Sequence, residues 1–129
     1  MDIRSYRDLR VWRHGMDLTV SVYRLTAAFP REEQFGLTSQ AHRAATSIPA
    51  NIAEGYGRDS RASYINFPRI AQGSLKELET HMLISTRIGI TTPDAINPLL
   101  DEADQIGKML RALIATLLKP KPQALTPNP

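Results

Sequence analysis

The chain has 129 residues, enough for one domain with one modest core. Hydrophobic residues make up 42% of it and charged residues 22%, a balance typical of folded domains rather than disordered chains. Cysteine is absent, which excludes disulfides and thiolate sites, and no apolar run approaches the roughly 20 residues that span a bilayer. The N-terminal residues lack the apolar segment of a secretory signal, so we expect a cytoplasmic protein of bacterial type.

Arginine dominates the positive charge. The formal net charge is +3, and 12 of the 16 basic residues are arginine. Four of these recur every third residue at the N-terminus: Arg4, Arg7, Arg10 and Arg13. The spacing predicts positive charge along one side of a helical segment, where planar guanidinium groups could bind phosphate. The alternative is a solvated face that only aids solubility, and a charge of +3 does not by itself predict nucleic-acid binding.

The first predicted helix ends at Pro30, because proline cannot donate the helical hydrogen bond. Ser5 and Asp8 have the spacing of a capping box ahead of it. Residues 31–36 are polar, end in glycine and predict a loop. The apolar residues of this helix form two stripes, Val11, Leu18, Val22, Leu25 and Phe29 on one and Trp12, Met16, Val20 and Tyr23 on the other.

The second helix is expected to begin near residues 37–39, with Thr38 as its cap, and to end at Gly55 and Gly57. Pro49 falls inside it and predicts a kink, because the proline ring clashes with the carbonyl one turn earlier. Its apolar stripe consists of Ala41, Ala45, Ile48 and Ile52.

The third helix is expected to run from its cap at Ser60 to Gly89, with a second kink at Pro68. Its apolar residues are Tyr64, Phe67, Ala71, Leu78, Met82 and Ile88.

A start signal for the fourth helix lies in residues 92–94, a threonine cap followed by proline and an acid. Pro98 lies one turn further, so we expect the regular helix to begin only near Asn97 and Pro98. The spacing of its main seam is that of a helical bundle, Leu99, Ala103, Ile106, Leu110, Leu113 and Leu117.

Four helices joined by short loops predict an all-α, antiparallel up-down-up-down four-helix bundle over residues 1–118. The proline-rich tail, residues 119–129, is predicted to be disordered. The first and fourth helices carry more than one apolar stripe, and on the fourth Leu100, Ile114 and Leu118 lie off the main seam. Because so broad an apolar surface must be buried on a second face, we expect a homo-oligomer.

Polar residues also recur on shared faces of the second and third helices. We interpret them as a structural polar network in which Asn51 and Glu54 bond to the third helix or to the carbonyl released by Pro49. In the alternative interpretation, Arg43, Glu54 and Arg58 border a ligand or nucleic-acid surface. The expected members of the network are Ser47, Asn51, Glu54, Ser74 and Glu77.

No catalytic, cofactor or metal site is predicted. A di-iron bundle needs Glu-x-x-His motifs, which the chain lacks. Glu77 and His81 could hold a metal weakly, but we interpret them as a surface pair. His14 and His42 lack obvious carboxylate partners.

Several motifs together resemble a known family: YRDLRVW at 6–12, FGLTSQ at 35–40, RAATSIPANIAEGYGR at 43–58, IAQGSLKELETHML at 70–83 and IGKMLRALI at 106–114. They are similar to the small four-helix bundle proteins encoded in intervening sequences of bacterial 23S ribosomal RNA genes. The resemblance implies a bundle that assembles as a ring, commonly a homopentamer, with no established enzymatic activity. A relative, the accessory protein of diversity-generating retroelements, binds nucleic acid and a reverse transcriptase. Pro68 and Pro98 depart from the family pattern.

These observations predict a non-catalytic, homo-oligomeric scaffold that binds RNA or DNA through a basic surface. The alternative is a protein–protein adaptor for a neighbouring partner such as a reverse transcriptase, without a direct nucleic-acid role. Neither interpretation requires a cofactor or a membrane. The candidate nucleic-acid-binding residues are Arg4, Arg7, Arg10, Arg13, Arg43, Arg58 and Arg61.

Overall fold

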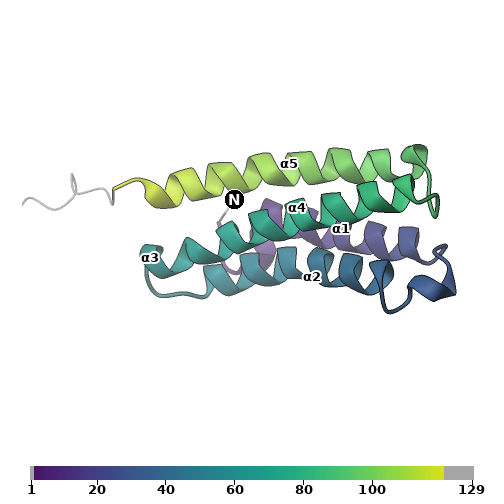
Figure 1. Ribbon diagram of the computed structural model, residues 1–129. Coiled ribbons are helices and arrows are strands. Elements are labelled where there is room, and N and C mark those ends of the chain that lie inside the picture. Colours follow the sequence, from purple (N-terminus) through teal and green to yellow (C-terminus); the bar gives the residue numbers. More distant parts are fainter. Residues whose placement is uncertain (1, 121–129) are drawn as a thin grey trace, which may run out of the picture.

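The computed structural model describes residues 2–120, and every regular element within them is helical. Four long helices run alternately up and down (Figure 1), which confirms the all-α antiparallel bundle. They are α1 (Arg10–Thr26), α2 (Leu37–Tyr56), α4 (Asn66–Arg87) and α5 (Pro93–Leu118). Three short elements complete the described chain, the 3-10 helices η1 (Tyr6–Asp8) and η2 (Arg31–Glu33) and the single-turn helix α3 (Arg61–Tyr64). Most of the predicted tail, residues 121–129, lies outside this range.

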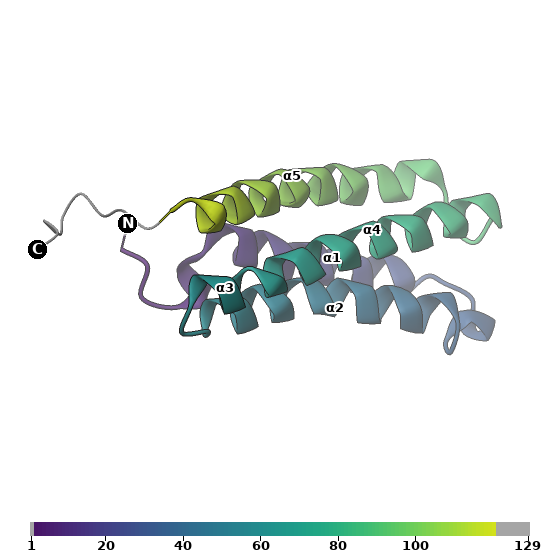
Figure 2. The same cartoon turned by 60° about the vertical axis from the view of Figure 1, so that its left-hand side comes forward.

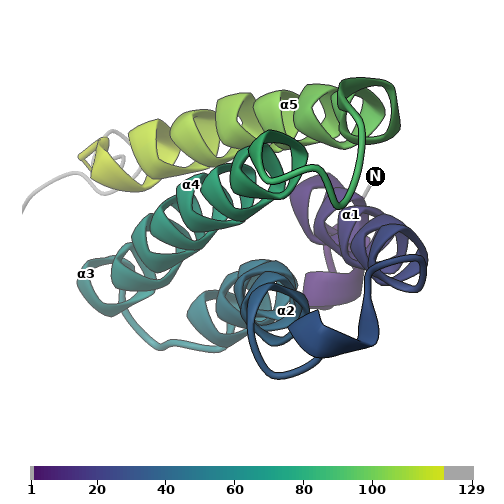
Figure 3. The same ribbon diagram turned by 45° about the vertical axis from the view of Figure 1, so that its right-hand side comes forward.

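The four long helices surround one core in the order α1, α2, α4 and α5, each in contact with the next and α5 with α1 (Figure 3). The first residues of α1 and the last of α5 lie at the same end of the bundle, together with α3 (Figure 2). The predicted main stripes supply the core, whose completely covered side chains include Leu18, Ile48, Leu78, Ile106 and Leu110. None of the described helices combines the length and hydropathy needed to cross a bilayer.

The predicted capping box is present, but it caps η1 and not α1. The Ser5 hydroxyl accepts the Arg7 N–H at 3.0 Å, and the Asp8 carboxylate accepts the Ser5 N–H at 3.2 Å. At α2 the expected cap is wrong, because Gly36 and not Thr38 occupies the N-cap position. Glycine offers no side-chain acceptor, and Oε1 of Glu33 in η2 takes the Leu37 N–H instead at 3.2 Å.

Two of the three prolines that we expected inside helices, Pro49 and Pro98, lie within a continuous helix, whereas Pro68 lies in the first turn of one. α2 continues through Pro49 without interruption. The expected third helix is instead two helices, α3 and α4, separated at Ile65. Pro68 is the third residue of α4, where the missing N–H costs nothing because the first turn has no intrahelical acceptor for it. A helix continuing from α3 would have needed that N–H, so the proline favours a new start.

The fourth helix begins earlier than expected. α5 starts at Pro93, where the Thr92 hydroxyl accepts the Ala95 N–H at 3.2 Å, and it continues through Pro98. The expectation that regular helix begins only near Asn97 and Pro98 is therefore wrong. The carbonyl that Pro98 leaves without a partner belongs to the exposed residue Asp94, where water can bind it.

The second apolar faces of the two outer helices differ. On α1 three of the four residues of the predicted second stripe are exposed, Met16 by 41%, Val20 by 46% and Tyr23 by 46%, whereas Trp12 packs against the core. On α5 we expected Leu100, Ile114 and Leu118 to form a second apolar face that another subunit covers. This is wrong for two of the three, because Ile114 is buried and Leu100 packs against the core within the same subunit. Only Leu118 is exposed among the three. A single subunit therefore leaves one apolar face of α1 uncovered.

Candidate nucleic-acid interface

A polar seam of three side chains joins α2 to α4. Ser47 Oγ lies 2.8 Å from Ser74 Oγ across the two helices. Asn51 Nδ2 donates to Ser47 Oγ at 2.9 Å and to the Ser47 carbonyl at 2.8 Å. All three residues are half-buried. The structure thus brings together Ser47, Asn51 and Ser74, and the contact between helices is made by the serines and not by Asn51.

The two glutamates assigned to the network lie outside it. Glu54 Oε1 is 3.2 Å from the guanidinium of Arg58, and Glu77 Oε2 is 3.4 Å from His81 Nε2. Each pair joins residues four positions apart, and Arg58 lies just beyond the end of α2, so neither pair links two helices; both carboxylates are more than half exposed. Such exposed pairs contribute only a few tenths of a kcal/mol.

The carbonyl released by Pro49 has a partner that the sequence reasoning missed. Thr19 Oγ1 of α1 lies 3.1 Å from the Ala45 carbonyl and 2.8 Å from the Gly15 carbonyl of its own helix, so its one proton is shared between the two, and neither Asn51 nor Glu54 bonds to the Ala45 carbonyl. Gly15, one turn before Thr19, lies against Ile48 and Pro49, and a Cβ there would make ordinary contacts of 3.4–3.5 Å with them. The only signal of this contact in the sequence was that two small residues, Gly15 and Thr19, lie four positions apart on α1.

The N-terminal arginines do not share one helical face. The chain leaves η1 through Leu9 in an extended conformation (ψ 125°), so Arg4 and Arg7 lie outside the regular helix that carries Arg10 and Arg13. Arg13 turns back, donating through Nε to the Arg7 carbonyl at 2.9 Å and lying 3.7 Å from the Asp8 carboxylate.

Asp8 is held ionised within this group. Backbone N–H groups of Arg4 (2.8 Å) and Ser5 (3.2 Å) donate to its carboxylate and, with Arg13, hold the pKa of Asp8 below its ordinary value despite partial desolvation. Arg13 is therefore partly neutralised. Arg10 is exposed and forms no ion pair within residues 2–120, so its guanidinium is available to phosphate.

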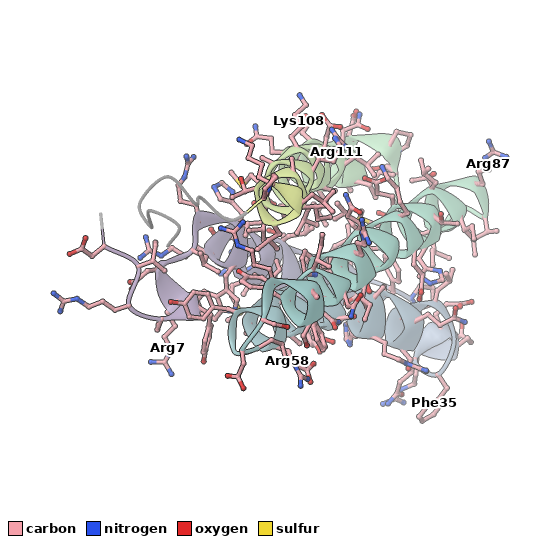
Figure 4. The ribbon with its side chains drawn as sticks, turned by 90° about the vertical axis from the view of Figure 1, so that its left-hand side faces the viewer. Arg7, Phe35, Arg58, Arg87, Lys108 and Arg111 are labelled. Carbon is pink, nitrogen blue, oxygen red and sulfur yellow. The ribbon has the colours of Figure 1, made fainter. Side chains whose placement is uncertain are left out.

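The remaining candidate arginines lie in two places. Arg58 lies 4.5 Å above the Phe67 ring, at the same end of the bundle as Arg7, whereas Arg87 and Phe35 lie at the opposite end (Figure 4). Arg61 of α3 donates to the Lys119 carbonyl at 2.9 Å, which ties α3 to the end of α5. Arg43 is exposed in the first half of α2, away from this group.

Division of the bundle at the midpoints of its long helices shows a strong asymmetry of charge. The terminal half, residues 2–18, 47–76 and 106–120, contains eleven Lys and Arg against five Asp and Glu, a net +6. The distal half, residues 19–46 and 77–105, contains four against eight, a net −4. The modest charge of the whole chain therefore conceals a basic half and an acidic half.

Aromatic residues also gather in the terminal half. Tyr6 meets Trp12 edge-to-face with ring centroids 5.2 Å apart, and Tyr56 meets Tyr64 in the same way at 6.4 Å. Burial, and to a smaller extent the neighbouring Tyr56, raises the pKa of Tyr64. These rings and Phe67 are half-buried. Arg7 lies over the Tyr6 ring at 5.7 Å and Arg58 over Phe67, whereas Trp12 packs against the core.

A pocket of about 370 Å³ opens between α4 and α5, also in the terminal half. Arg69 and Lys76 line it from α4 and Arg111 from α5, with no carboxylate among its lining residues. Sequence reasoning missed this site, because Arg69 and Arg111 lie on different helices and share no motif. The signal that existed was a glycine on each helix, Gly73 and Gly107, at positions that face the pocket.

The histidines do not form a metal site. No group of three or more His, Cys, Asp or Glu that could hold a metal occurs within the described part of the chain. His42 stacks on Tyr23 with centroids 3.8 Å apart, and its Nε2 lies 2.8 Å from the Thr26 hydroxyl. Burial lowers the pKa of His42.

Comparison with known proteins is consistent with this fold. The family model of the 23S rRNA-intervening sequence protein matches residues 7–112. A solved structure from Bacteroides thetaiotaomicron VPI-5482, described as a protein with unknown function from the S23 ribosomal protein family, is 26% identical with a TM-score of 0.72. That match covers 81% of this chain and 97% of the other. A search among curated proteins found no match. The chain belongs to the 23S rRNA-intervening sequence protein family.

Proposed function

We propose that the protein is a non-catalytic, homo-oligomeric scaffold that binds nucleic acid through its terminal half. The observation that supports the proposal most directly is the net +6 of that half, set against −4 in the other. Phosphate contacts by arginine and lysine provide most of the affinity of sequence-independent nucleic-acid binding. The name of the family refers to ribosomal RNA, and that of the solved relative's family refers to the ribosome.

The proposed interface combines charge with stacking. Arg7 and Arg10 are exposed at the beginning of the bundle, and the Arg7 guanidinium lies 5.7 Å from the centre of the half-buried Tyr6 ring. Unpaired bases stack on such rings, whereas a duplex offers mainly its backbone. Single-stranded RNA or DNA is therefore the ligand that this surface suits best. Such a role places the protein in the bacterial cytoplasm.

Self-association is the second part of the proposal. Met16, Val20 and Tyr23 form a partly exposed stripe on α1, in which only the Tyr23 ring stacks on a residue of another helix, His42, and a second copy of the chain would remove the exposed part from water. We propose a ring, a pentamer by the family resemblance, in which the basic halves of several subunits add to one field.

Binding can be measured by fluorescence anisotropy with labelled single-stranded RNA and duplex DNA over a range of salt concentrations. We expect affinity to fall steeply with salt. The double substitution Arg7→Gln with Arg10→Gln should reduce the logarithmic slope by about 0.7 for each phosphate of a single strand that the variant no longer neutralises. The matched control is Arg31→Gln with Arg87→Gln, which removes the same charge from the distal half. An equal loss of affinity in the two double variants, or binding that salt does not affect, would contradict the proposal.

The same exposed stripe supports the adaptor as a second candidate function. An adaptor would use the α1 face for a different protein and the basic half would be incidental. In that case the assembled protein binds neither nucleic acid, and its α1 stripe is covered only when the partner is present.

A further inference from the structure

The pocket between α4 and α5 has the features of a small-ligand site that differs from the open basic surface. Its volume of about 370 Å³ is at the lower end of the range for small-molecule pockets, large enough for one nucleotide and too small for a duplex. The walls are residues of the first half of α4 and the second half of α5, Arg69, Gln72, Gly73, Leu75, Lys76, Gly107 and Arg111. Figure 4 shows Arg111 on α5, close to Lys108.

The hollow exists because two helix positions lack side chains. A Cβ at Gly73 would have nothing within 4 Å, and one at Gly107 would touch only the Leu75 side chain at 3.5 Å and the Arg111 guanidinium at 3.7 Å. Alanine would fit at both positions and would favour the helix, since glycine in a helix interior is unfavourable. Contacts with neighbouring atoms therefore do not require glycine at either position. A ligand that fills the space in front of the two glycines would require it.

The charges of the pocket are free to bind an anion. Neither Arg69 nor Arg111 forms an ion pair or a side-chain hydrogen bond within residues 2–120. Lys76 forms an ion pair with Glu79, with Nζ 3.2 Å from Oε1. The two guanidinium groups come from the two helices that form the pocket, Arg69 from α4 and Arg111 from α5. Paired guanidinium groups bind phosphate in two-point geometry, and a phosphate monoester, with close to two negative charges, suits two of them better than a diester with one.

We propose that this pocket binds the terminal phosphate of a nucleotide, with Arg69 and Arg111 on the phosphate and Gln72 against the nucleoside. Two sources present the same chemistry, a free nucleoside monophosphate and the 5′-phosphorylated end of a strand. For the strand end, the inference rests on the proposed function and makes it more specific, because the surrounding basic surface would hold the rest of the strand.

The test compares a single-stranded RNA carrying a 5′-phosphate with the same RNA carrying a 5′-hydroxyl, both labelled at the 3′ end, and AMP with adenosine. We expect the phosphorylated strand to bind about tenfold more tightly or better, the effect of one charge-assisted hydrogen bond pair. Gly73→Leu fills the pocket without removing charge and should abolish that preference while affinity for the 5′-hydroxyl strand is retained. Arg111→Gln should abolish it by removing a donor, so the test does not depend on one variant folding. Arg87→Gln, an exposed arginine at the far end of α4, is the control and should keep the preference.

The possible outcomes separate this inference from the proposed function. If both strands bind equally and the salt dependence is steep, the pocket inference is wrong and the nucleic-acid function stands. A preference that persists in Gly73→Leu also overturns the inference. If AMP binds, adenosine does not, Gly73→Leu blocks AMP and neither strand binds, then the pocket is a nucleotide site and the proposed nucleic-acid function is wrong.

Discussion

At the scale of single residues, two helical glycines occupy opposite environments. Gly55, near the end of α2, is buried, and a Cβ there would lie 2.9 Å from the Phe67 Cβ and 3.1 Å from the Tyr64 carbonyl. Gly73 of α4 faces open space. The first glycine is required for the close approach of α2 to the α3–α4 junction, and the second has no steric reason.

We predict opposite effects of alanine at these two positions. Gly55→Ala should destabilise the protein by about 1–3 kcal/mol, because rigid backbone and Cβ atoms must move to accept the methyl group. Gly73→Ala should stabilise it by about 0.5–1 kcal/mol through helix propensity alone. Urea denaturation measures the change in unfolding free energy of each variant. If Gly55→Ala stabilised the protein as Gly73→Ala is expected to do, the contact of α2 with the α3–α4 junction would have room for a methyl group.

His42 should make stability depend on pH. Its pKa is lowered in the folded protein by burial, whereas the unfolded chain has the ordinary value of 6.5. As the pH falls through 6.5, the unfolded state therefore takes up a proton before the folded state does. The free energy of unfolding has its full value above pH 6.5 and decreases as the pH falls below it. Denaturation between about pH 8 and about pH 5.5 should show this slope, and His42→Gln should make it shallower. An unchanged slope in the variant would assign the dependence to other groups.

At the scale of helices, the interface of α2 with α4 is the most extensive in the bundle, and Ser47 and Ser74 provide its direct side-chain hydrogen bond. A bond between two half-buried hydroxyls fixes the register of two helices that apolar contacts alone would allow to slide.

We expect Ser47→Ala and Ser74→Ala to show a coupling of about 0.5–1.5 kcal/mol in a double-mutant cycle of unfolding free energies. Thr80 of α4 is a suitable control, because its hydroxyl donates only to the Lys76 carbonyl of its own helix at 2.8 Å. Ser47→Ala and Thr80→Ala should therefore be additive within about 0.5 kcal/mol. Coupling that is absent from the serine pair would mean that the seam does not hold the helices in register.

Thr19 should stabilise the contact of α1 with α2. Thr19→Val keeps the shape of the side chain but removes the hydroxyl that the Gly15 and Ala45 carbonyls share, at a cost of about 1–2 kcal/mol. Thr46→Val is the matched control, since the exposed Thr46 hydroxyl bonds only within α2, and it should change stability by less than about 0.5 kcal/mol. Similar destabilisation in both variants would argue against a special role for the Ala45 carbonyl.

At the scale of the whole molecule, the uncovered α1 stripe and the basic terminal half lie on one subunit that is otherwise well packed. Val20→Glu places a charge in the middle of that stripe, on a side chain that is already 46% exposed. We expect it to reduce the mass in solution, measured by light scattering, from a multiple of the subunit to a single subunit, with unchanged helical circular dichroism.

The control for this substitution is Gln105→Glu, which introduces the same charge on an exposed position of α5 and should leave the assembly intact. Assembly of the Val20→Glu variant would place the interface elsewhere, for example on the exposed Leu83 and Ile88 of α4 and its C-terminal end. A wild-type protein that remains a single subunit at tens of micromolar, about the range where standard interfaces associate, would contradict self-association.

Local signals in the sequence were sufficient for most of the secondary structure and for the class of fold. The Thr92 cap and the glycine at the end of α2 act within one turn of their own positions, and the apolar period places Ile106 and Leu110 in the core without knowledge of any partner. The effect of Pro98 was misjudged, because a proline past the first turn is tolerated where the freed carbonyl can meet water.

Only the tertiary structure decided which helices meet and what they bring together. The bond of Thr19 to the Ala45 carbonyl and the seam of Ser47 and Ser74 join positions far apart in the chain, and one pocket is lined by both Arg69 and Arg111. A helical period specifies which residues share a face but not which helix that face contacts, because many pairings bury the same apolar area. The division into a basic and an acidic half arises in the same way, from the direction in which each helix crosses the bundle.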